Sequence, residues 1–196
     1  MRIHLLRKIA ALLLLLLTNI SFAQRTSLEG LLDEAINLSQ KEQVEELAEV
    51  LKSGSIALES EANTRGNDFK NNLLEQAKVL KSLAPLATQG SLKKETVTNT
   101  INTIKLLLGA NHINNLLSEG KEGLLGNAVS LMTSLNLLKS GKAVLDNKGQ
   151  EKLDKLVDSV ADNVKKLDGK DTEAKVAATS AKRILGKIVD LVRETI

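Results

Sequence analysis

The chain has 196 residues but no cysteine, no tryptophan and no tyrosine, and its only proline is Pro85. Without cysteine it can form neither a disulfide nor a thiolate metal site. Without tryptophan and tyrosine it lacks the stacking platforms that bind single-stranded nucleic acid. The only aromatic residues are Phe22 and Phe69. A folded core must therefore be built from leucine, isoleucine, valine and alanine.

The first 24 residues follow the three-part order of a secretory signal peptide. Basic side chains open the chain, six consecutive leucines follow at Leu12–Leu17, and the small residues Ser21 and Ala23 stand just before Gln24. Polar residues interrupt the apolar run, which is shorter than the ~20 residues that a membrane-spanning helix needs. We therefore predict that residues 1–23 are a cleaved signal peptide. We also predict export to the periplasm or the extracellular space of a Gram-negative bacterium.

Removal of this leader changes the charge balance. The whole chain has a formal charge of +3, and the leader holds three basic residues and no acidic one, which leaves 24 of each sign. No cluster of lysine and arginine stands out, so we predict no nucleic-acid partner. The remaining charge is uneven, with an acidic excess over residues 24–75 and a basic excess over residues 76–145. An acidic first element can thus lie against a more basic one, within one chain or between two.

Apolar residues recur at three- and four-residue spacing in every long segment, and no stretch alternates strictly. This pattern predicts α-helices and no half-buried strand. We expect an all-α protein in which residues 24–196 form a single, mostly antiparallel bundle of about six helices with short connections.

Several residues predict where these helices begin and end. Ser27 can cap the first helix, and the mixed polar stretch 53–67 indicates a loop. Pro85 should kink or end its helix near Leu83, and Gly109 should stop the next one. The apolar stripe of the last helix, which Asp171 or Thr172 can cap, is wide enough to pack on two neighbours.

Catalytic chemistry has little support in the sequence. His112 is the only histidine after the leader, and no acidic residue lies near it in sequence. A lone histidine lacks the base and orienting partner that mark a catalytic site, so we interpret His112 as a loop or helix-start residue. The acidic turns 146–149 and 168–171 do not match the calcium-loop spacing. We therefore predict a non-enzyme with no catalytic, cofactor-binding or metal-binding residue and no cofactor.

Acidic residues also repeat along one predicted helix, at Asp154, Asp158 and Asp162. Lysines stand between and around them, which is typical of a solvated face with local ion pairs. Two catalytic carboxylates would instead have to face each other across a cleft.

One segment, residues 123–138, has no charged side chain over its 16 residues. It is a candidate for membrane or partner contact, although its length favours a covered bundle helix. The candidate residues are Leu124, Leu125, Ala128, Leu131, Met132, Leu135 and Leu138.

Apolar stripes are plentiful and polar chemistry is scarce, so we predict an exported, non-enzymatic helical-bundle protein that acts through protein–protein contacts. Its partner is another protein or a second copy of the chain. The alternatives are a carrier of a lipid or another apolar small molecule, and a membrane-active helical protein.

Overall fold

The computed structural model describes residues 27–169 and 171–196, so the predicted signal peptide lies outside the described residues. Within these ranges the chain forms seven α-helices, two short 3-10 turns and no strand. The predicted all-α class is confirmed, with one helix more than the expected six or so.

The helices follow one another with short connections. In chain order they are α2 (Leu28–Gln40), α3 (Val44–Arg65), α4 (Lys70–Thr88), α5 (Lys94–Ser118), α6 (Ala128–Gly141), α7 (Asn147–Lys165) and α8 (Thr172–Thr195). The 3-10 turns are η1 (Asn67–Phe69) before α4 and η2 (Lys142–Val144) after α6.

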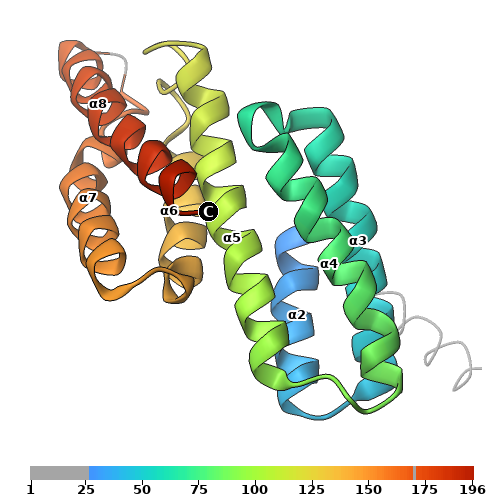
Figure 1. Cartoon of the computed structure of the whole chain (residues 1–196). Coiled ribbons are helices and arrows are strands. Elements are labelled where there is room, and N and C mark those ends of the chain that lie inside the picture. Colours follow the sequence, from blue (N-terminus) through green and yellow to red (C-terminus); the bar gives the residue numbers. More distant parts are fainter. Residues whose placement is uncertain (1–26, 170) are drawn as a thin grey trace, which may run out of the picture.

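Helix α5 runs through the middle of the molecule and separates two groups of helices (Figure 1). It packs against α2 and α4 on one side and against α6 and α8 on the other. Every residue from Ile104 to Asn111 is buried, so α5 has no solvent face in its central part. A helix that is buried all round, and mostly apolar, lies between two layers. The buried side chains of both groups accordingly join in one core around α5.

Gly109 does not stop a helix, and this prediction was wrong. It lies inside α5, where a Cβ atom would come within 2.7 Å of the carbonyl oxygen of Ser134 in α6. Gly141 plays the same part from the α6 side, because its Cβ would lie 2.5 Å from the carbonyl oxygen of Asn102. Glycine costs a helix interior about 1 kcal/mol. The buried residues around Gly109 offset that cost, since the missing side chain lets α5 and α6 approach closely.

The predicted loop over residues 53–67 was also wrong, because α3 continues unbroken to Arg65. Leu58 and Ala62 are fully buried in this part of the helix, and the Ser55 hydroxyl donates to the carbonyl of Ala77 in α4 at 2.9 Å. Most of the polar residues that suggested a loop are exposed to solvent, among them Ser53, Glu59 and Asn63, whereas Ser55 is buried against α4.

Helix α4 continues past Pro85 to Thr88, so of the predicted kink or end near Leu83 the end is wrong. Ala84 and Ala87 are buried on the two sides of the proline and hold the last turn against the core.

The predictions for the first and last helices were correct. The Ser27 hydroxyl accepts from the Gly30 amide at 3.1 Å, and the Asp171 carboxylate accepts from the Ala174 amide at 2.9 Å. Helix α8 packs on both α5 and α7, as its wide stripe predicted.

Candidate functional site

The uncharged segment 123–138 forms the turn before α6 and most of α6 itself. Five of its seven candidate residues are buried, whereas Leu125 and Met132 are partly buried against the core. The buried five are Leu124, Ala128, Leu131, Leu135 and Leu138. Among the helices of the described ranges, none combines the length and the apolar character that crossing a membrane would require.

The exposed side of α6 is unusual because it also lacks charge. Its solvent-facing residues before Leu138 are Val129, Ser130, Thr133 and Asn136, and Val129 is 76% exposed. Charged side chains make up 26% of the whole chain. We call these four residues the α6 face.

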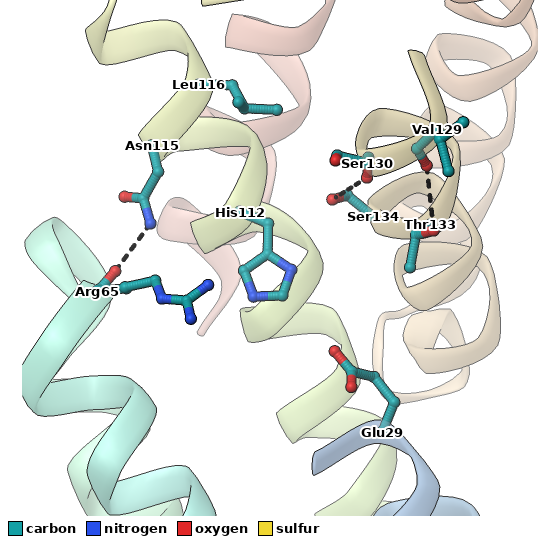
Figure 2. A pocket seen from close by; sticks show the side chains of 9 residues that line it. All are labelled: Glu29, Arg65, His112, Asn115, Leu116, Val129, Ser130, Thr133 and Ser134. Atoms are coloured by element: carbon teal, nitrogen blue, oxygen red, sulfur yellow. Dashed lines mark hydrogen bonds between the residues drawn. The ribbon is translucent and has the colours of Figure 1, made fainter. Parts of the chain in front are cut away.

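A recess of about 360 Å³ lies beside the α6 face. Figure 2 shows that α2, α3, α5 and α6 each contribute side chains to it. Its lining residues are Glu29, Arg65, His112, Asn115, Leu116, Val129, Ser130, Thr133 and Ser134. The α6 wall is uncharged, whereas the opposite side carries Glu29 and Arg65.

His112 lies well inside α5, so its interpretation as a loop or helix-start residue was wrong. Its Nε2 atom is 3.3 Å from Oε1 of Glu61, which lies 51 residues earlier in the chain. The Nε atom of Arg65 is 3.9 Å from the other oxygen of Glu61. Both members of the Glu61–His112 pair are largely buried, with side chains 16% and 26% exposed.

Two asparagines of α5 fix the end of α3 beside this pair. The side-chain amides of Asn111 and Asn115 donate to the carbonyl oxygen of Arg65, at 3.0 and 2.9 Å. The last carbonyls of a helix have no partner within the helix. The two amides therefore supply a cap from a neighbouring helix. Asn115 in turn accepts from the amide of Asn67 at 2.6 Å.

The hydroxyls across the recess are engaged within their own helix. Ser134 donates to the carbonyl of Ser130 at 2.9 Å, and Thr133 donates to that of Val129 at 3.1 Å. A nucleophilic hydroxyl would instead donate to the imidazole that serves as its base. His112 and Glu61 therefore contact each other, whereas these two hydroxyls donate to carbonyls of their own helix.

The acidic turns serve as helix caps. Asp146 accepts from the amide of Gly149 at 2.7 Å at the start of α7. Asp168 accepts from the amide of Ala128 at 3.1 Å and so caps α6, which begins 40 residues earlier in the chain. The residues next to Asp168 in the sequence give no indication of this role. Within residues 27–169 and 171–196, no three histidine or acidic side chains are placed to hold a metal ion.

The acidic row of α7 is ion-paired in part across helices. Lys142 of η2 contacts Asp154 at 2.6 Å, and Lys139 of α6 contacts Asp158 at 3.1 Å. Asp162 pairs within α7, with Lys165 at 3.0 Å. The predicted local ion pairs are thus present, but two of the three tie α7 to its neighbour.

No protein-family model, no curated protein and no solved structure matches this chain. A functional proposal therefore rests on the residues of the chain itself.

Proposed function

We propose that the chain is an exported, non-enzymatic helical protein that acts by contact with a protein partner. The observation that carries this proposal is the exposed but uncharged α6 face beside a recess. The centres of protein–protein interfaces are depleted in charged residues and keep a polar rim. The α6 face likewise carries no charge, and its one aliphatic residue, Val129, is exposed at the start of the helix.

The recess would favour one orientation of the bound partner. Its uncharged α6 wall faces Glu29 and Arg65, so a partner segment that enters it meets apolar and hydroxyl groups on one side and ions on the other. Asymmetry of this kind fixes the orientation of a partner more than it adds affinity.

Export belongs to the same proposal and is supported by the signal-peptide pattern of residues 1–23. The mostly antiparallel order of the bundle belongs to it as well, and the short connections between helices support it.

The composition of the hollows favours protein contact over carriage of an apolar molecule. Ligand pockets for such molecules are lined predominantly by apolar side chains. The recess is instead lined partly by ions, and a second hollow between α3 and α4 is lined by Glu59, Lys78 and Lys81 among others.

An enzyme is the second candidate, because the Glu61–His112 pair adjoins the recess. A substrate bound there would meet an imidazole oriented by a carboxylate, which is the arrangement of a general base. If hydrolysis of model esters is detected and is lost in the His112→Gln variant, the enzyme replaces the contact protein as the preferred function.

The contact proposal is tested by placing a charge on the α6 face. Val129→Arg adds a charge at an exposed position, and Ser159→Arg adds the same charge on the exposed side of α7. We expect wild type and Ser159→Arg to capture the same protein from the exported fraction, and Val129→Arg to lose it at least tenfold. Equal capture by all three proteins would contradict the proposal.

A further inference from the structure

The exposed faces of α3 and α8 carry opposite charges, and within the described residues these charges form no ion pairs. The first is on α3, where Glu45, Glu46, Glu49 and Glu59 are exposed around a single Lys52. None of these five side chains takes part in an ion pair in the ranges 27–169 and 171–196. We call these residues, together with Ile56, the acidic face.

The second is on α8, where Lys175, Lys182, Arg183 and Lys187 are exposed. The sequence holds no acidic residue between Glu173 and Asp190. In the part of the chain that the structure describes, none of these four side chains forms an ion pair, although Lys139, Lys142 and other lysines do. We call these residues, together with Val176, the basic face.

Each face also exposes one aliphatic side chain among its charges. Ile56 is 70% exposed on the acidic face, and Val176 is 61% exposed on the basic face. A single exposed aliphatic residue is ordinary on its own. Here each lies on a helix face with a net charge: Val176 lies among lysines and an arginine, and Ile56 lies between Lys52 and Glu59 on the mainly acidic face.

The two faces cannot meet within one chain. Helices α3 and α8 lie on opposite sides of α5 (Figure 1), and the charged residues of both face solvent. Their charges are complementary, so the acidic face of one chain matches the basic face of another.

We propose that copies of this chain associate head to tail, with the acidic face of one copy on the basic face of the next. An interface between two different surfaces is heterologous, and it produces rings or open filaments rather than a closed dimer. This inference extends the proposed contact function by naming a partner, and it uses surfaces that do not include the recess.

A second copy of the chain accounts for both charged faces, whereas an anionic partner accounts for only one of them. An anionic membrane or a nucleic acid would use the basic face but would leave the acidic face and Ile56 without a role. A second copy uses both faces at once.

The association should be weak and salt-sensitive, because its charges are solvent-exposed. The screening length falls from about 10 Å at 0.1 M salt to about 3 Å at 1 M. We expect sedimentation velocity of the exported protein to show larger species as its concentration rises in 50 mM salt, and a single monomer in 1 M salt.

Charge reversal on each face provides the decisive test. One variant carries Glu45→Lys, Glu46→Lys and Glu49→Lys, and the other carries Lys182→Glu, Arg183→Glu and Lys187→Glu. Each variant alone then presents two faces of like charge and should sediment as a monomer. A one-to-one mixture of the two has complementary faces again and should recover the larger species. A control on α7, Lys148→Glu, Lys152→Glu and Lys155→Glu, makes the same charge change as the reversal of the basic face and should associate like wild type.

Circular dichroism of each variant shows that the helices are retained. A mixture that stays monomeric, or a single reversal variant that associates like wild type, would overturn the head-to-tail proposal. Association that survives both reversals and is lost in Val129→Arg would overturn it while supporting contact through the α6 face. Binding of the basic face to anionic vesicles or to DNA without self-association would overturn it in favour of an anionic partner.

Discussion

The buried side-chain amide of Asn111 donates to the carbonyl oxygen of Arg65 at 3.0 Å and thereby joins the centre of α5 to the end of α3. Asn115 donates to the same oxygen at 2.9 Å. The shared acceptor makes the two amides partly interchangeable. Glu61, which contacts His112 at 3.3 Å, lies one helical turn before Arg65.

The shared acceptor leads to a prediction about additivity. Asn111→Ala should lower the free energy of unfolding by about 1 kcal/mol, because Asn115 still satisfies the Arg65 carbonyl. Asn115→Ala should cost less, since its side chain is less buried than that of Asn111. The double variant should exceed the sum of the two by about 0.5 kcal/mol or more, as is typical of groups in one network. Urea unfolding followed by circular dichroism measures this, because the chain has no tryptophan or tyrosine. Strict additivity would show that the two amides act separately.

The close approach of α5 and α6 at Gly109 gives a second prediction. Gly109→Ala places a methyl group 2.7 Å from the Ser134 carbonyl oxygen, which belongs to the backbone and cannot rotate away. We expect a loss of about 1–3 kcal/mol in the free energy of unfolding.

Gly186 supplies the matched control, since a Cβ there meets no atom within 4 Å. Gly186→Ala in α8 should stabilise the protein by about 0.5–1 kcal/mol through helix propensity alone. Equal effects of the two substitutions in thermal unfolding would contradict the close crossing of α5 and α6.

The ion pair of Lys105 with Asp33 gives a third prediction because its two members differ in exposure. Its side chain is 9% exposed and contacts Asp33 of α2, whose side chain is 69% exposed. Lys105→Met keeps the buried aliphatic stem and removes the charge, so it should change the free energy of unfolding by less than about 1 kcal/mol. Asp33→Asn leaves the ammonium without its carboxylate and should be the more destabilising of the two. Denaturant midpoints of both variants decide the order, and the reverse order would show that the ion pair stabilises the contact between α2 and α5.

The contact of Glu42 with Lys94 gives a pH-dependent prediction. The two side chains lie 2.8 Å apart, and the hydrogen bond and positive charge of Lys94 lower the pKa of the Glu42 carboxyl. A lowered pKa in the folded state means that the contact stabilises the protein at neutral pH and that this stabilisation is lost as the pH falls through the folded-state value. Melting temperatures of wild type and Glu42→Gln should therefore differ at pH 7 and converge in acid. A difference that grows on acidification would show the opposite sign of linkage.

Local signals in the sequence were sufficient for the features that depend on near neighbours. Asp171 and Ser27 cap helices that begin immediately after them, and the apolar stripe of α8 is wide because two helices cover it. These interactions join residues only a few positions apart, or they follow from the periodicity of one helix.

Other features depend on residues far apart in sequence and could not be predicted in this way. A glycine often ends a helix, but Gly109 lies inside α5 where α6 crosses it. Only the position of α6 shows that this glycine permits close packing and does not end the helix. His112 has no acidic neighbour in sequence, and its partner Glu61 is brought to it by the packing of α3 on α5. The recess also needs residues of four helices at once.

The most direct test of a contact role places a photo-crosslinking amino acid at Val129 in the living cell. Our account predicts that a defined protein is cross-linked from Val129 and not from Ser159 on α7, which is also exposed. No cross-linked protein at Val129, or the same products from both positions, would contradict the account.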